Sequence, residues 1–324
     1  MERISLPGGK AILPLGLGTA NFGTSVSEQD AFAQMDRFIE QGRTLLDTAR
    51  VYGDWEPGTC GLSEKTVGRW LSSRGARERV VLVTKGGHPP LDNMALSRVT
   101  PAAIRQDLAQ SLSHLQTDYV DFYLLHRDDP TVPVGEILDC LEEQRQQGRL
   151  RQYGCSNWST ARIEEAQAYA MRRGFAGFSV YQVQYSLPAV NRAPLARSGM
   201  CTLDGAARAF HRRTGMPVMA YMAMGGGALQ KLVHTGTLPA SLQEMYGNET
   251  NRALASLLRE KGATPQAITQ YVLAFLWEEP DFTVIPLVSF RQMDQLEDCL
   301  ACLTTPPDQE LLDKLRGIRL QHIG

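Results

Sequence analysis

The chain of 324 residues lacks any long apolar run, although 43% of its residues are hydrophobic. No run approaches the ~18 apolar residues that a membrane-spanning helix needs. The first residues, MERISLPGG, also lack the apolar core of a secretory signal peptide. We therefore expect no membrane partner and a cytoplasmic location.

An excess of charge and a dense set of cysteines are absent as well. The 33 Lys and Arg residues nearly balance 35 Asp and Glu residues, which gives no electrostatic reason to expect a nucleic-acid partner. Six cysteines in a chain this long do not resemble a disulfide scaffold. Cys299 and Cys302 form one C-x-x-C pair, but no second pair exists to complete a zinc site. We predict no metal and interpret the pair as packing residues.

No low-complexity tract or linker divides the chain, so we predict a single domain over residues 1–324. At its start, Pro7-Gly8-Gly9 separates ERISL from KAILP, which predicts a short β-hairpin. Eight short apolar runs follow, most of them rich in the residues typical of strands buried on both faces. These runs are 15–20, 44–49, 80–85, 120–126, 151–156, 180–185, 217–222 and 283–288.

Helical patterns alternate with these runs. One begins near Ser27, a candidate N-cap with Asp30 three positions on, and ends toward Gln41-Gly42. Thr100-Pro101 and Thr264-Pro265 are helix-start signals, because proline is tolerated at the first helical position. The other predicted helices cover 62–73, 101–116, 133–147, 159–173, 202–214 and 264–277.

Eight strands alternating with helices indicate an α/β fold of the (β/α)8 type, a TIM barrel. The alternative, an open doubly wound sheet, would be expected to carry G-x-G-x-x-G after its first strand. The segment GLGTANFG (16–23) lacks that spacing. We therefore predict a barrel with a short N-terminal β-hairpin and a C-terminal helical extension over 303–324. Residues 225–249 are interpreted as a loop on the cofactor side.

Four ionisable residues occur where barrel strands end, the position at which barrel enzymes place their active sites. Asp47 ends the second strand, Tyr52 follows in its loop, Lys85 ends the third strand and His126 ends the fourth. Each alone has an ordinary structural interpretation. Together they suit a proton donor: a tyrosine pKa of ~10 is too high for easy donation, and a neighbouring ammonium held by a carboxylate would lower it.

The segments around these residues resemble signature segments of the aldo-keto reductase family. They are GRTLLDTARVYG (42–53), GLSEKTVGRWL (61–71), VTKGG (83–87) and DFYLLHRDD (121–129). The resemblance implies a catalytic tetrad of Asp47, Tyr52, Lys85 and His126, with Tyr52 as the general acid. It also implies binding of NAD(P)H without a Rossmann fold, with NADP(H) favoured over NAD(H), and a small carbonyl or sugar substrate. The chain would be a monomer or a homo-oligomer.

The resemblance extends to residues that would bind the cofactor. It implies that Ser156, Asn157 and Gln182 hold the nicotinamide carboxamide, beside Asp47, and that Tyr221 stacks on the ring. Thr19 would lie near the cofactor. At the adenine end, Ser289 would cap a helix and Arg291 would meet a 2′-phosphate, although a solvated surface charge is the alternative for Arg291.

Three loop residues, Trp55, His88 and Trp158, are candidate walls of a substrate pocket, with ordinary loop packing as the alternative. We expect reduction of an aldehyde or ketone by hydride transfer, with Tyr52 protonating the oxygen. Two other functions stay open: a cofactor-binding regulatory subunit with little turnover, and a sugar dehydrogenase that works in the oxidative direction.

Overall fold

A closed barrel of eight parallel strands organises the chain in the computed structural model, which describes residues 2–304 and 306–321. The strand order around the barrel is β10-β3-β4-β5-β6-β7-β8-β9. Each strand lies in or overlaps one of the eight predicted runs, so the predicted TIM barrel is confirmed. The strands are β3 (Gly16–Gly18), β4 (Leu45–Asp47), β5 (Val81–Gly86), β6 (Val120–Leu125), β7 (Leu150–Ser156), β8 (Tyr181–Gln184), β9 (Val218–Tyr221) and β10 (Val284–Val288).

The N-terminal hairpin is confirmed too. Strand β1 (Ile4–Ser5) pairs antiparallel with β2 (Ala11–Ile12), and Ile4 lies opposite Ile12. The backbone N–H of Gly9 donates to the carbonyl of Leu6, which closes the turn that Pro7-Gly8-Gly9 predicts.

Seven helices follow the predicted pattern, and their caps explain where they begin. The side chains of Ser27, Thr100 and Thr264 each accept a hydrogen bond from the backbone N–H three residues on. In α1 the buried residues Ala31, Met35 and Phe38 recur at helical spacing and form its core-facing stripe. The seven helices are α1 (Glu28–Glu40), α2 (Leu62–Arg74), α3 (Pro101–Leu115), α4 (Val134–Gln146), α5 (Thr160–Arg173), α7 (Gly205–Thr214) and α11 (Pro265–Trp277).

The interpretation of residues 225–249 as a loop was wrong, because short helices occupy most of that segment. A 3-10 turn, η2 (Gly225–Gly227), leads into α8 (Ala228–Thr235), and α9 (Ala240–Tyr246) follows. Gly236 at the C-cap of α8, with φ 74°, ends that helix after eight residues. The remaining helical elements are η1 (Arg77–Arg79), α6 (Arg192–Arg197), α10 (Glu249–Glu260), α12 (Met293–Ala301) and α13 (Gln309–Leu320).

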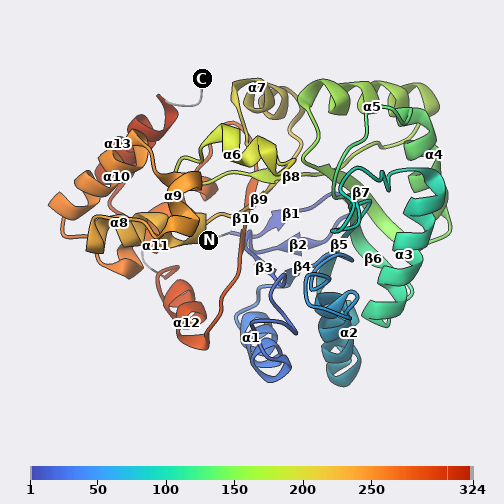
Figure 1. Ribbon diagram of the computed structural model, residues 1–324, viewed down its shortest axis with the longest axis horizontal. Helices are drawn as coiled ribbons and strands as arrows, with labels where there is room; N and C mark the ends of the chain where they lie inside the picture. The colour runs from blue at the N-terminus through green and yellow to red at the C-terminus, as the bar shows by residue number, and fades with distance from the viewer. Residues whose placement is uncertain (1, 305, 322–324) are drawn as a thin grey trace. The chain divides into compact units, whose positions relative to one another are not determined.

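Helix α13 confirms the C-terminal helical extension, of which residues 305 and 322–324 lie outside the described residues. Contacts divide the chain into two compact units, residues 2–182 with 289–293 and residues 183–288 with 294–324. In the first unit, helices α1 to α5 follow one another around strands β3 to β7 (Figure 1). In the second, α8 and α13 both pack on α10 (Figure 1). The expectation of one domain stays a prediction.

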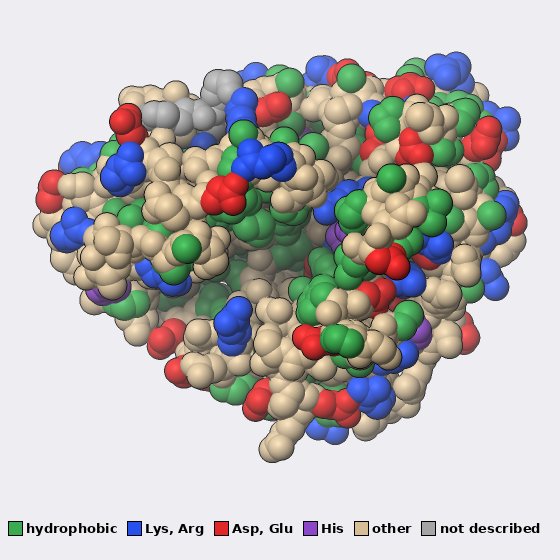
Figure 2. Space-filling model, in the orientation of Figure 1, with side chains coloured by type: hydrophobic (Ala, Val, Ile, Leu, Met, Phe, Trp, Pro, Cys, Tyr) green, Lys and Arg blue, Asp and Glu red, His purple; other side chains and the backbone are tan. Residues whose placement is uncertain are grey.

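The surface shows no concentration of one charge on the face seen in Figure 2, where Lys and Arg side chains alternate with Asp and Glu. This agrees with the near-neutral composition. Over residues 2–304 and 306–321, none of the helices combines the length and the apolar character needed to cross a membrane.

A buried histidine makes stability depend on pH. His211 on α7 is fully buried, its Nδ1 lies 2.8 Å from the carbonyl oxygen of Met216, and burial lowers its pKa from 6.5 to about 4. Below pH 6.5 the His211 side chain becomes protonated in the unfolded chain but stays neutral in the folded chain. The free energy of unfolding therefore falls as the pH drops toward 4. The loss from this group is about 3 kcal/mol. We expect His211→Asn to flatten the fall in urea-unfolding free energy between pH 7 and pH 4.5, and the exposed His234→Asn to leave it unchanged.

Candidate active site

Three neighbouring strands bring the predicted tetrad together. Asp47 is the last residue of β4 and lies opposite Val83 of β5; Lys85 lies near the end of β5, opposite Leu124 of β6. Parallel strands end at the same edge of a sheet, so their terminal side chains converge there. His126 follows β6 directly, and its backbone N–H donates to the carbonyl of Gly86.

The loop after β4 fixes Tyr52 at this edge. The Tyr52 backbone N–H donates to the carbonyl of Ala49, and the next residue is Gly53 with φ 92°. A Cβ at Gly53 would lie 2.6 Å from the Cβ of Leu62, so only glycine lets the loop pack this closely on the start of α2.

The Lys85 ammonium is the centre of the site. Its side chain is completely buried, and Nζ donates to Asp47 Oδ2 at 2.8 Å, to the Thr48 carbonyl at 2.7 Å and to Tyr52 Oη at 3.3 Å. An ammonium has three N–H donors, so these acceptors satisfy it completely. Burial opposes its charge, but Asp47 and Tyr52 outweigh burial and raise the pKa of Lys85. Lys85 is therefore expected to carry its positive charge beside the phenol at neutral pH.

Asp47 connects Lys85 to Gln182 on β8 and to Thr19, which follows β3. Its Oδ1 accepts a hydrogen bond of 2.8 Å from the Gln182 amide, while Oδ2 accepts from Lys85. Its backbone carbonyl accepts from both the N–H and the hydroxyl of Thr19. The carboxylate is thus held at both oxygens and serves as the counterion that keeps Lys85 in place.

A chain of buried hydroxyl groups supports this arrangement, and sequence reasoning missed it. Ser63 Oγ lies 2.8 Å from the Thr19 hydroxyl and 2.9 Å from the Thr48 hydroxyl, and it donates to the Thr19 carbonyl. The available signal was the polar Ser63 in the buried first turn of α2. These bonds tie the ends of β3 and β4 to that helix.

His126 is neutral and buried beside Tyr52. The two rings meet nearly perpendicular, with centroids 5.7 Å apart. Burial, with help from the charges of Lys85 and Arg127, holds the pKa of His126 well below 6.5. No described residue hydrogen-bonds its Nδ1, so no acceptor is present for a proton there, which favours the neutral tautomer with the proton on Nε2. Such a ring can donate one hydrogen bond to a carbonyl oxygen.

The pKa of Tyr52 differs from the sequence expectation. Burial raises it above 10, and the attraction of Lys85 offsets only part of that rise. The expectation that Lys85 pulls the pKa below its ordinary value was therefore wrong for the chain alone, because the cost of burying a phenolate cannot be read from the sequence. The lysine still stabilises the phenolate relative to a site without it.

The residues predicted to hold the nicotinamide carboxamide, Ser156, Asn157 and Gln182, form a second polar group on β7 and β8, with Asn157 directly after β7. Ser156 pairs in register with Gln182. Asn157, in the left-handed conformation with φ 61°, donates from Nδ2 to Ser156 Oγ at 3.0 Å. All three side chains are buried. Buried amide and hydroxyl groups at strand ends fit a ligand that carries its own amide, such as the carboxamide of a nicotinamide.

Comparison with known proteins identifies the chain. The sequence pattern described as the Aldo/keto reductase family matches residues 14–319. The chain belongs to the aldo/keto reductase family. It is 32% identical to an uncharacterized oxidoreductase, YrpG, of Bacillus subtilis (strain 168), over 96% of this chain and 93% of that protein. It is 29% identical to norsolorinic acid reductase stcV of Emericella nidulans, over 89% of this chain and 73% of the relative.

A solved structure shares the fold of this aldo/keto reductase. The crystal structure of the thermostable aldo-keto reductase Tm1743, in complex with the inhibitor epalrestat, superposes with a TM-score of 0.68 at 25% identity. The match covers 98% of this chain and all of that one. Members of the family are NAD(P)H-dependent oxidoreductases and typically use NADP(H).

The other predicted cofactor residues, Tyr221, Ser289 and Arg291, lie at the end of β9 and after β10. Tyr221 ends β9, is partly exposed and donates to the Cys201 carbonyl at 3.4 Å. Ser289 and Arg291 are exposed in the segment between β10 and α12. Helix α12 begins at Met293, four residues after Ser289, so the prediction that Ser289 caps it was wrong: residues 291 and 292 form a bend before the helix.

The three candidate pocket residues differ in their surroundings. Trp55 is 47% exposed, and its ring centroid lies 6.4 Å from that of Tyr52. His88 is partly buried, with its ring centroid 4.9 Å from that of His126. Trp158 is only 1% exposed; it packs on Phe178 and donates from Nε1 to the Arg127 carbonyl. These contacts favour the packing interpretation for Trp158, and we keep Trp55 and His88 as pocket candidates.

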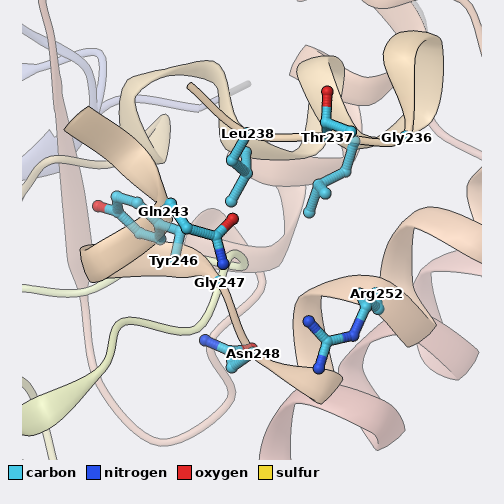
Figure 3. A pocket seen from close by; sticks show the side chains of 9 residues that line it. Gly236, Thr237, Leu238, Gln243, Tyr246, Gly247, Asn248 and Arg252 are labelled. Carbon is cyan, nitrogen blue, oxygen red and sulfur yellow. The ribbon is translucent and has the colours of Figure 1, made fainter. Parts of the chain in front are cut away.

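A separate cavity lies among the short helices that replace the expected loop. It has a volume of about 270 Å³, and Figure 3 shows Thr237 and Leu238 along one wall with Asn248 and Arg252 along the opposite one. Of the described residues that line it, one is a tyrosine, Tyr246, and none is an aspartate, a lysine or a histidine. The cavity therefore lacks three of the four residue types that make up the tetrad.

The C-x-x-C pair lies at the end of α12. Cys302 Sγ donates to the Cys299 carbonyl at 3.1 Å, and Cys299 is buried. Within the part of the chain that the structure describes, no group of three or more His, Cys, Asp or Glu residues could hold a metal ion.

Proposed function

We propose that this aldo/keto reductase reduces an aldehyde or ketone with NADPH, and that Tyr52 is the general acid. The observation that supports this most strongly is the hydrogen bond from Lys85 Nζ to Tyr52 Oη. Because the phenol oxygen accepts from the ammonium, its own hydrogen is available to another acceptor. A carbonyl oxygen beside Tyr52 is that acceptor.

Each residue of the tetrad has a different role in proton transfer. A nicotinamide cofactor, which Ser156, Asn157 and Gln182 would hold, would supply a hydride to the carbonyl carbon. The neutral His126 ring donates a hydrogen bond to the carbonyl oxygen, and Tyr52 gives its proton to the same oxygen as negative charge develops there. Lys85 stabilises the phenolate that remains, and Asp47 keeps Lys85 charged and in place. Tyr52 then regains a proton from water.

The proposed cofactor residues have matching roles. Ser156, Asn157 and Gln182 would hold the carboxamide and so fix which face of the ring meets the substrate. Thr19 would line the same edge, and Tyr221 would stack on the ring. The substrate is a small carbonyl compound or a sugar, with Trp55 and His88 as pocket walls. Cytoplasmic location and a monomeric or homo-oligomeric state stay predictions from the sequence.

Arg291 provides a test of coenzyme preference. If its guanidinium binds the 2′-phosphate of NADPH, Arg291→Ala should raise the Kd for NADPH by about tenfold or more and leave that for NADH unchanged. Fluorescence titration with both coenzymes measures this. Arg172→Ala, which removes a similar cation from α5, is the matched control. Equal changes for the two coenzymes would show that Arg291 is a surface charge.

The function itself is tested by titrating the protein with NADPH and NADH and then screening carbonyl compounds with the tighter coenzyme. Consumption of NADPH with formation of the alcohol supports the reductase. Tight coenzyme binding without turnover across a broad carbonyl panel would instead indicate a regulatory subunit. Faster reduction of NAD⁺ or NADP⁺ by aldoses than oxidation of NADPH by aldehydes would indicate a sugar dehydrogenase.

A further inference from the structure

None of the described residues gives the His126 ring the hydrogen bond that usually fixes a functional histidine. Only 8% of the residue is exposed, and its buried Nδ1 has no partner among residues 2–304 and 306–321. A histidine that acts through one ring nitrogen is commonly held by a hydrogen bond at the other, which sets both tautomer and orientation. Another contact must therefore hold this ring.

Two aromatic rings supply that contact. The Tyr52 ring meets His126 at 78° with centroids 5.7 Å apart, and the His88 ring meets it at 68° with centroids 4.9 Å apart. Both are edge-to-face arrangements, the favoured geometry for aromatic pairs. Tyr52 belongs to the reacting groups, so His88 is the contact with no other assigned role in proton transfer.

His88 is itself held firmly enough to act as a support. Its Nδ1 lies 2.6 Å from the carbonyl oxygen of Pro89. A carbonyl can only accept, so Nδ1 carries the proton and the ring orientation is fixed. Burial lowers the pKa of His88, which favours the neutral ring and avoids repulsion between two imidazolium ions.

We propose that His88 is a positioning residue whose ring holds His126 in the orientation at which Nε2–H meets the substrate carbonyl. This rests on the proposed function. Ring packing takes the place of a hydrogen bond at Nδ1, and His88, which would also line the substrate pocket, acts on proton transfer through His126. A phenylalanine ring at position 88 should therefore hold His126 nearly as well as the histidine ring does.

The test compares His88→Ala with His88→Phe, each alone and combined with His126→Ala. We expect His88→Ala to lower kcat by about 10- to 100-fold with the Kd for NADPH unchanged. His88→Phe should retain most of the activity. In the His126→Ala background, His88→Ala should not lower kcat further, because the residue through which His88 acts is absent. His234→Ala, an exposed histidine on α8, is the matched control.

Two results would overturn the proposal. One is that His88→Ala lowers kcat as much in the His126→Ala background as in the wild type. The other is that His88→Phe lowers kcat as much as His88→Ala does. A nitrogen-15 NMR spectrum of the histidine side chains provides a readout without turnover. The wild type should show one neutral Nε2–H tautomer for His126, and His88→Ala a mixture of both tautomers. An unchanged spectrum in His88→Ala would contradict the proposal, and this result needs no known substrate. If the protein had no reductase activity, the spectrum could still show the expected change, so failure of the proposed function and failure of this proposal are distinguishable.

Discussion

Tyr52→Phe is expected to lower kcat for carbonyl reduction by about 10²- to 10⁴-fold, the usual contribution of a general acid. The substitution keeps the ring, including its packing against His126, and removes only the hydroxyl that accepts from Lys85. The Kd for NADPH should stay close to that of the wild type, because the carboxamide residues are untouched. Steady-state kinetics with the best carbonyl substrate, together with a fluorescence titration, measures both quantities.

A matched control is Tyr169→Phe, which removes a phenol hydroxyl on α5 that donates to Asp139. It should leave kcat unchanged. Turnover by Tyr52→Phe within a few-fold of the wild type would remove Tyr52 from the role of proton donor, even if the protein reduces carbonyl compounds.

Lys85→Met should lower the free energy of unfolding by about 3–5 kcal/mol and also abolish turnover, because it leaves the Asp47 carboxylate buried without its counterion. The two side chains are 0% and 5% exposed, and their charged atoms are 2.8 Å apart. The double variant with Asp47→Asn should recover much of the stability, since no buried charge remains and Gln182 keeps an acceptor at position 47. It should not recover turnover. Urea unfolding and activity assays give the two readouts.

The exposed pair Lys314–Glu310 on α13 is the control for this experiment, and Lys314→Met should change stability little. If Lys85→Met were as stable as the wild type, Lys85 and Asp47 would not form the buried ion pair on which the site depends. If the double variant were no more stable than Lys85→Met alone, the loss would reflect packing and not charge.

The barrel could be predicted from the sequence because each repeat carries its own local signals. Threonine caps followed by proline mark the starts of α3 and α11, and short apolar runs mark the strands. Parallel strands share one functional edge, so Asp47, Lys85 and His126 could be placed together before any distance was known.

What escaped prediction depends on burial and on contacts between distant residues. Helices α8 and α9 are eight and seven residues long, too short for a clear periodic pattern, and glycines surround α8. The raised pKa of Tyr52 follows from how much protein surrounds its hydroxyl. Likewise, Trp158 looks like a loop residue in the sequence, and only its contact with Phe178 shows that it is part of the core.

Isotope transfer tests the central claim most directly. The protein is incubated with NADPH deuterated at both C4 positions and with the carbonyl compound that it reduces fastest, and the alcohol is analysed by mass spectrometry. We predict one deuterium on the former carbonyl carbon of the wild-type product. Over the same reaction time, Tyr52→Phe should form far less of this alcohol. An alcohol without deuterium, formed while NADPH is consumed, would contradict hydride transfer at this site.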